Sequence, residues 1–348
     1  MVLKSKKIKA LTAGIMLTLA MGLLGGCGSD KKEAGDKKVN VGIVQMVEHE
    51  ALDSANKGFV DGMAAKGYKE GQNVVYDRQN AQADQSNLQN IAHRFVSNKV
   101  DLICAIATPA AQTVANVTKD IPIVATAVTD YEAAKLVKSN EKPATNVTGT
   151  TDMNPVEAQL DLLLKLVPGA KTIGTIYCSS EVNSQLQVEL LKKAAAAKGI
   201  AVKEATVSTV NDIQQAARSL VGDVQAIYVP TDNVLASAMP TLNVVTAEAK
   251  LPVICGEGGM VKAGGLATLG IDYYKLGVQT GEMAADILSG KAKPADMAIQ
   301  AQKEFTVMIN KKEAQKIGLT IPEAVMKDAK IIEYKKEKMS AFFMADIL

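Results

Sequence analysis

Hydrophobic and polar positions alternate on two length scales from Val39 onward. Short apolar runs rich in β-branched residues are separated by longer stretches in which apolar residues recur with the period of an amphipathic helix. The short runs predict strands at 41–46, 73–78, 100–105, 121–125, 172–177, 201–206, 226–229, 252–255 and 266–270. The longer stretches predict helices at 52–66, 84–97, 109–118, 155–166, 184–198, 212–221, 233–249 and 273–288. Regular strand–helix alternation is typical of parallel sheets with helices on both faces, so we expect an α/β protein.

A polar, proline-containing segment at 139–146 interrupts this alternation near the middle of the chain. The 348 residues are more than one sheet needs. On each side of the segment, a strand is followed by a helix ending in Lys-Gly and by a second strand. We therefore expect two doubly wound lobes of similar architecture, with the chain crossing between them at this segment.

The first 26 residues have the pattern of an export signal. Lysines at positions 4, 6, 7 and 9 precede an apolar run, 10–24, which is shorter than the roughly 20 residues of a permanent membrane span. The run ends in Leu-Gly-Gly before Cys27, which resembles a bacterial lipobox and implies cleavage before Cys27 and a lipid on its sulfur. We expect residues 27–38 to form a flexible polar tether. The alternative is a simple membrane anchor with an incidental cysteine.

Composition narrows the range of partners. The chain is 47% hydrophobic and 22% charged, which is ordinary for a globular protein. Loss of the four N-terminal lysines would leave 35 of the 39 basic residues against 37 acidic ones, a formal charge of −2, so neither nucleic acid nor anionic lipid is favoured as a partner. Cys104, Cys178 and Cys255 look like small buried residues, and neither histidine lies near a cysteine in sequence, so we expect no metal site.

Polar residues follow the predicted strands, where ligands bind in open parallel sheets. Thr108 is one of them, and Pro109 suits the first helical position, so we expect Thr108 to be an N-cap. The amides that follow, beginning with Ala110, would then form an anion site fit for a carboxylate, unless Thr108 only caps its own helix. The acidic residues Asp130, Asp232 and Glu257 could each neutralise an ammonium group or be ordinary helix caps.

Common enzyme motifs are missing from the sequence: it has no dinucleotide or phosphate-binding glycine loop, no nucleophile elbow and no zinc-protease motif. Glu48-His49-Glu50 could hold a metal or act as acid and base, but a lone loop histidine is more often a hydrogen-bonding residue. An exported hydrolase using Glu48, His49 and Asp53 therefore stays open only as an alternative, and we expect no enzyme activity and no cofactor.

Several stretches, taken together, resemble the substrate-binding lipoproteins of bacterial ABC importers of the tryptophan or tyrosine type. The stretches are VGIVQMVEHEALDSANKGF, DLICAIATPAAQTVAN, IPIVATAVTD, NVTGTTDMNPVE, IGTIYCSSEVNSQLQ, IYVPTDN and IDYYKLGVQTG. The resemblance implies a type I periplasmic-binding-protein fold whose two lobes are joined by three crossings, with an aromatic amino acid held between them and passed to a membrane permease. It also implies an extracytoplasmic protein, anchored here through Cys27.

With this resemblance, the first lobe is expected at 39–148 and about 264–303, and the second at 149–263 and about 304–337, with no role assigned to 338–348. The expected ligand-binding residues are Glu48, Ala107, Thr108, Ala110, Thr129, Asp130, Tyr131, Tyr177, Ser180, Asn183, Asp232, Glu257 and Asp272. Tyr131 departs from the family, which usually has proline there, and could extend or narrow an aromatic pocket. We expect a monomer, and a sugar or nucleoside receptor for a sensor or transporter is the alternative.

Overall fold

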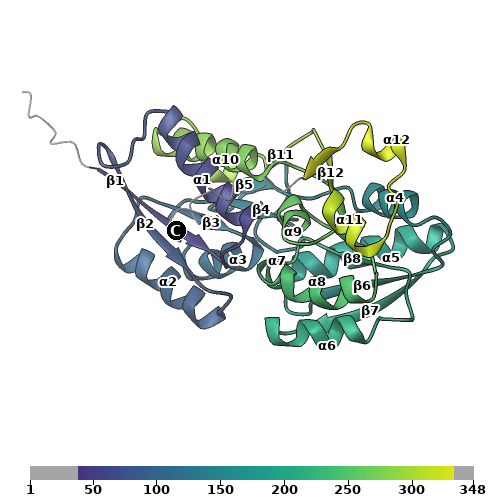
Figure 1. The fold of residues 1–348 in the computed structure, drawn as a ribbon. Helices are drawn as coiled ribbons and strands as arrows, with labels where there is room; N and C mark the ends of the chain where they lie inside the picture. Colours follow the sequence, from purple (N-terminus) through teal and green to yellow (C-terminus); the bar gives the residue numbers. More distant parts are fainter. Residues whose placement is uncertain (1–37, 333–348) are drawn as a thin grey trace, which may run out of the picture. The chain divides into compact units, whose positions relative to one another are not determined.

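The computed structural model describes residues 38–332, which contain two β-sheets (Figure 1). In the first sheet the strands lie in the order β11-β5-β4-β3-β1-β2 and every pairing is parallel. Its strands are β1 (Val39–Gln45), β2 (Val74–Asn80), β3 (Leu102–Ile106), β4 (Ile123–Val128), β5 (Val147–Thr151) and β11 (Gln300–Ala301). Its helices are α1 (Glu50–Ala65), α2 (Gln85–Ser97), α3 (Thr108–Val117), α10 (Tyr273–Leu288) and the short 3-10 turn η2 (Pro294–Asp296).

The second sheet has the order β13-β12-β10-β9-β8-β6-β7. Its strands are β6 (Thr172–Cys178), β7 (Ala201–Val207), β8 (Ala226–Val229), β9 (Val253–Cys255), β10 (Ala267–Gly270), β12 (Thr306–Asn310) and β13 (Lys330–Ile332). Its helices are α4 (Val156–Leu166), α5 (Val182–Ala197), η1 (Val210–Asp212), α6 (Ile213–Arg218), α7 (Asn233–Ser237), α8 (Met239–Glu248), α9 (Gly258–Lys262), α11 (Lys311–Ile317) and α12 (Glu323–Met326). The pairing of β10 with β12 is antiparallel, so this sheet is mixed rather than purely parallel.

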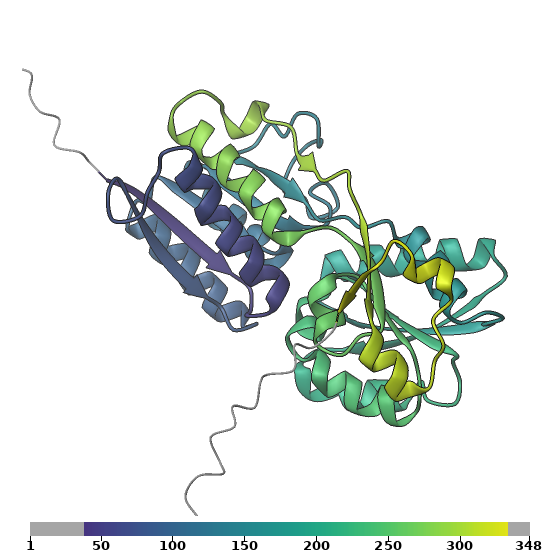
Figure 2. The ribbon, with the colours of Figure 1, turned by 45° about the horizontal axis from the view of Figure 1, so that its top comes forward.

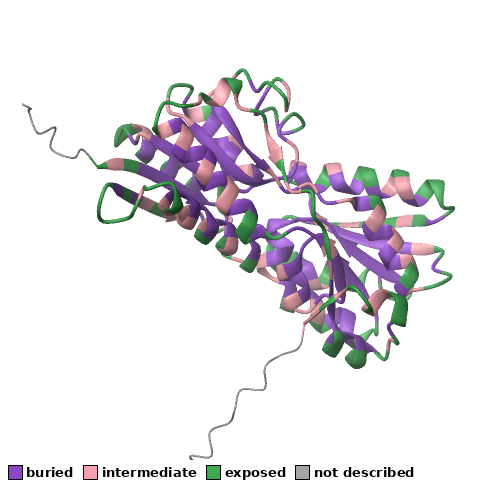
Figure 3. Cartoon of the chain, turned by 90° about the horizontal axis from the view of Figure 1, so that it is seen from above, coloured by how far each residue is buried: buried purple, intermediate pink, exposed green. Residues whose placement is uncertain are grey.

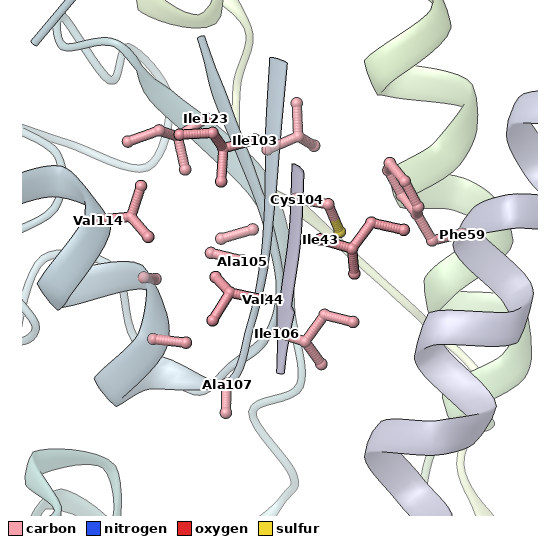
Figure 4. Packing of buried hydrophobic residues seen from close by; sticks show 14 of the residues in the cluster. Ile43, Val44, Phe59, Ile103, Cys104, Ala105, Ile106, Ala107, Val114 and Ile123 are labelled. Carbon is pink, nitrogen blue, oxygen red and sulfur yellow. The ribbon is translucent and has the colours of Figure 1, made fainter. Parts of the chain in front are cut away.

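The first core packs against both faces of the first sheet (Figure 4). Side chains alternate along a strand, so Cys104 points toward Phe59 of α1 while its neighbour Ala105 points toward Val114 of α3. Two further clusters of buried side chains cover the faces of the second sheet. Most residues of the central strands are buried (Figure 3), which explains why the sequence reads there as continuous apolar runs.

The chain passes between the sheets three times, after Thr151, after Gly270 and after Ala301. The fold class expected from the sequence is therefore confirmed, with two doubly wound lobes and three crossings. The first crossing was expected at 139–146, but this segment connects β4 to β5 within the first sheet, where Asn146 donates to the carbonyl groups of Thr118 and Ile121. In addition, β10 belongs to the second sheet, although 264–303 was expected in the first lobe.

The nine predicted strands are all present, with ends shifted by up to three residues. The predicted helix 233–249 is instead two helices, α7 and α8, because Pro240 has no N–H to donate and its ring crowds the preceding turn. Within residues 38–332 no helix combines the length and the hydrophobicity needed to cross a membrane. Cys104, Cys178 and Cys255 are buried and unpaired, as the sequence indicated. The expected signal, tether and Cys27 lie outside the described residues, as does the segment 338–348.

Helices α1 and α10 lie side by side over the first sheet (Figure 2). Glycines on both helices allow their backbones to approach closely: Gly58 and Gly62 on α1, and Gly277 and Gly281 on α10. The two helices run parallel, because residues later in α1 meet residues later in α10. Both N-terminal ends therefore point the same way, toward the carboxyl ends of the strands.

Candidate functional site

A small pocket lies where loops from both sheets meet at the carboxyl ends of their strands. Each sheet reverses its strand order at one point, between β1 and β3 in the first and between β6 and β8 in the second, and ligands of open α/β sheets bind beside such points. The pocket is lined by His49, Leu52, Ala127, Thr129, Asp152, Asn183, Thr231, Asp232, Asn233, Ala236, Glu257, Met260 and Tyr273. The centre of a water molecule can reach only about 10 Å³ of it, which is room for about one water.

Asp152 is fully enclosed at the first crossing. Its carboxylate accepts a hydrogen bond from the Thr129 hydroxyl at 3.0 Å and another from the Tyr273 hydroxyl at 2.7 Å. Burial raises the pKa of Asp152 above its ordinary value, and the two hydroxyl donors oppose this rise. The carboxyl group therefore connects the end of β4 to the start of α10.

Glu181 precedes α5 and lies beside the pocket, and its side chain is also buried. Its Oε2 atom accepts from the Asn183 side chain at 2.9 Å and from the Asn233 side chain at 2.6 Å. Burial and the nearby Asp232 raise the pKa of Glu181 to about 8. The folded protein therefore holds a proton at this carboxyl group up to a higher pH than an ordinary glutamate does.

Asp232 and Glu257 are helix caps in the second lobe. Asp232 accepts from the backbone N–H of Leu235 at 2.9 Å and of Cys178 at 2.6 Å. Glu257 accepts from the N–H groups of Gly259 and Met260, the latter at 2.7 Å. Burial raises the pKa of both, that of Glu257 to about 7. Both residues are thus the caps that the sequence allowed, although they are buried rather than solvated.

His49 ends the loop after β1 and contacts the second lobe. Its Nε2 atom lies 3.5 Å from Oδ1 of Asn233, and burial lowers the pKa of His49 to about 4. The Nδ1 atom of His49 and the Oδ1 atom of Asn183 are buried without a hydrogen-bond partner. A neutral imidazole and an amide oxygen are therefore left facing a polar pocket, where a ligand or a water could satisfy them.

Two further contacts join the lobes around the pocket. The hydroxyl groups of Thr129 and Thr231 lie 3.3 Å apart. At the rim, Lys262 at the end of α9 forms an ion pair with Glu50 at the start of α1. Beyond this rim is a larger groove of about 550 Å³, whose lining includes Glu48, His49 and Pro240.

The structure brings together some of the residues expected from the sequence. Thr129, Asn183, Asp232 and Glu257 line the pocket itself. Glu48 lines the larger groove at the rim. Asp272 caps α10 and lines a neighbouring depression together with Glu257.

Other expected residues lie away from the pocket. Ala107, with a φ of 86°, precedes the first residue of α3, so Ala107 and not Thr108 has the N-cap position. Thr108 and Ala110 are buried without lining this pocket, and Asp130 accepts instead from the N–H of Ala133.

The tyrosines expected to contact a ligand side chain are also elsewhere. Tyr131 lies in the first core, where its hydroxyl donates to the carbonyl oxygen atoms of Ala125 and Thr150, and it does not line this pocket. The hydroxyl of Tyr177 donates to Glu204 at 2.9 Å. Ser180 is exposed beside Cys178.

Sequence reasoning missed Asp152, Glu181, Thr231, Asn233 and Tyr273 as site residues. Each stands within a few residues after a strand, which is the signal that could have found them. The alternative hydrolase set is not assembled, because Asp53 accepts from Gln45 at 2.7 Å and His49 contacts Asn233.

Comparison with known proteins agrees with this geometry. The family model for ABC transporter substrate binding proteins matches residues 40–332. The chain belongs to this family. By family it is therefore a substrate-binding protein, and its pocket is lined by hydrogen-bonded polar groups.

Relatives with known names or structures share most of this binding protein's length. A tyrosine-binding protein of Clostridioides difficile is 46% identical over 318 residues, 88% of this chain and 91% of the relative. A structure from Streptococcus pneumoniae in complex with L-Trp is 42% identical, with a TM-score of 0.82, over 85% of this chain and all of that one. A ligand-free, open structure of a Clostridium difficile substrate binding protein is 45% identical with the same coverage, and its TM-score is 0.66.

Proposed function

We propose that this protein captures a free aromatic amino acid between its two lobes and delivers it to the permease of an ABC importer. Family membership, the name of the Clostridioides difficile relative and the L-Trp complex of the Streptococcus pneumoniae relative support this proposal. Since family members act outside the cytoplasm, we propose further that Cys27 carries the lipid that holds the chain at the cell membrane.

The observation that carries the proposal is a set of buried carboxyl groups that form no ion pair with any of the residues 38–332. Asp152, Asp232 and Glu257 line the pocket, and Glu181 lies next to it. Their hydrogen-bond donors are hydroxyl groups, amide side chains and backbone amides, and no ion pair to any of them is found among residues 38–332. An α-ammonium group would supply the missing positive charge, and its contacts would strengthen as closure removes water.

Ligand entry requires the lobes to separate. In the described conformation the pocket has room for about one water, far less than an amino acid needs. The chain also superposes better on the L-Trp complex than on the open, ligand-free relative, although their sequence identities to it are similar. We propose that the described conformation corresponds to the closed state, which a permease can distinguish from the open one.

A thermal-shift survey against the twenty amino acids, common sugars and nucleosides tests this function. Aromatic amino acids should raise the melting temperature, because ligand at one hundred times its dissociation constant adds about 2.7 kcal/mol of stability. Bound L-Trp can also be followed by its fluorescence, since the chain has no tryptophan. A shift with a sugar or a nucleoside and with no amino acid would contradict the proposal.

A further inference from the structure

The carboxyl groups around the pocket differ in the groups that donate hydrogen bonds to their oxygen atoms. Asp232 and Glu257 accept from backbone N–H groups of their own lobe, and these bonds complete the first turns of α7 and α9. Asp232 accepts in addition from the Ser184 hydroxyl of the same lobe. Opening the lobes would leave those bonds intact, because donor and acceptor move together. The two groups therefore have structural partners whether or not a ligand is present.

The hydrogen-bond donors of Asp152 are of another kind. Its donors from other residues are the hydroxyl groups of Thr129 and Tyr273, and no backbone turn depends on them. A hydroxyl group can rotate its hydrogen away and present a lone pair instead, so an incoming donor can share this cluster. Thr129 also lies 3.3 Å from Thr231 of the second lobe, so the cluster is at the place where the lobes meet.

From this difference we propose that Asp152 is the carboxylate that binds the ligand's ammonium group, and that Asp232 and Glu257 act as helix caps. The inference rests on the proposed function, since it requires a ligand with an amino group. It differs from the expectation from sequence, which considered Asp130, Asp232 and Glu257 for this role.

Asp152 also lies where the chain connects the two lobes. It stands on the first crossing and bonds to Tyr273, which begins α10 directly after the second crossing. An ammonium group bound at Asp152 would therefore contact the first of the three connections and be linked to the second through the Tyr273 hydroxyl. Asp232 and Glu257 stand on the second lobe alone, so a ligand held only by them would have no direct contact with either connection.

Comparing each amino acid with an analogue that lacks its amino group separates ammonium binding from general effects of a substitution on the fold. L-Tyrosine, L-phenylalanine and L-tryptophan are each titrated beside the corresponding 3-arylpropanoate, which lacks only the amino group. The ratio of the two dissociation constants is measured for the wild type and for Asp152→Asn, Asp232→Asn and Glu257→Gln. Asn is nearly isosteric with Asp, and binding of the arylpropanoate reports whether each variant still folds.

We expect the wild type to prefer the amino acid, and Asp152→Asn to reduce this preference at least tenfold while arylpropanoate binding changes less than threefold. Asp232→Asn and Glu257→Gln should lose stability and keep the preference. Asp152→Ser is the second variant if Asp152→Asn does not fold, and Asp152→Glu should recover part of the preference. An unchanged preference in Asp152→Asn and Asp152→Ser, or its loss in Asp232→Asn or Glu257→Gln, would overturn the assignment alone. Failure of the wild type to bind any aromatic amino acid would overturn the proposed function and the assignment with it.

Discussion

Gly277 of α10 lies so close to Ala55 of α1 that an added Cβ atom on Gly277 would stand 2.0 Å from the Ala55 carbonyl oxygen. Likewise, a Cβ atom added to Gly58 of α1 would stand 2.1 Å from the carbonyl oxygen of Tyr274 in α10. The two helices are therefore in backbone contact near their N-terminal ends. Because these ends carry His49 and Tyr273, the contact fixes the first lobe's wall of the pocket.

Replacing Gly277 with alanine should destabilise the protein. Alanine is the better helix former, by roughly 0.5–1 kcal/mol, but the methyl group would force apart two packed backbones at a cost of about 1–3 kcal/mol or more. Chemical denaturation should therefore show a lower free energy of unfolding. Gly270→Ala is the matched control, since the nearest atom to its added Cβ is at 3.5 Å. Equal stability of both variants would contradict the close packing.

The ion pair between Lys262 and Glu50 should stabilise the closed conformation only slightly. Both side chains are more than 40% exposed, and exposed pairs contribute about 0.2–1 kcal/mol. Lys262→Glu should weaken ligand binding by up to about fivefold, and more at low salt than at high salt. The charge swap Glu50→Lys/Lys262→Glu should restore affinity. If the swap binds no better than the single variant, the pair does not bridge the lobes in solution.

Glu181 should make stability fall as the pH rises. Its pKa in the folded protein is raised to about 8, against 4.5 for an ordinary glutamate. Between these values the folded protein keeps a proton that the unfolded chain has lost, so this contribution decreases from about pH 4.5 to pH 8 and is constant above. Free energies of unfolding measured across this range should fall less steeply for Glu181→Gln. The exposed Glu189→Gln on the same helix is the control, and identical slopes for all three proteins would disprove the effect.

The fold could be predicted where a strand has a continuous apolar run, and it was missed where polar residues are buried. Strand β5 contains Thr148, Gly149 and Thr150, so no apolar run indicated it. Its threonines can be buried because their hydroxyl groups form hydrogen bonds. The hydroxyl oxygen atoms of Thr150 and Thr280 lie 2.8 Å apart, and the Thr148 hydroxyl donates to the carbonyl group of Met297. Such pairing depends on distant parts of the chain and has no local signature.

The location of the site could be predicted from the sequence, but the residues that form it could be predicted less well. The rule that ligands bind at the carboxyl ends of parallel strands led to Thr129, Asn183, Asp232 and Glu257, which line the pocket. It could not tell which residues after a strand turn inward.

Tyr131 shows the reason for this limit. The pairing of β4 with β5 shifts register between Ala125 and Val128, and Ala127 has a φ of 54°. The Tyr131 hydroxyl bonds to the carbonyl oxygen atoms of Ala125 and Thr150 beside this irregularity, which holds the ring in the core. A bulge of this kind is a product of the folded sheet.

The most direct test of the account is a calorimetric titration of the native protein with L-tyrosine, L-tryptophan and L-phenylalanine, with D-glucose as the comparison. We predict saturable binding of one molecule per chain for at least one of the three amino acids, recovery of the ligand unchanged, and no heat with glucose. Binding of glucose with no response to any of the three would contradict the proposal that this pocket receives an aromatic amino acid.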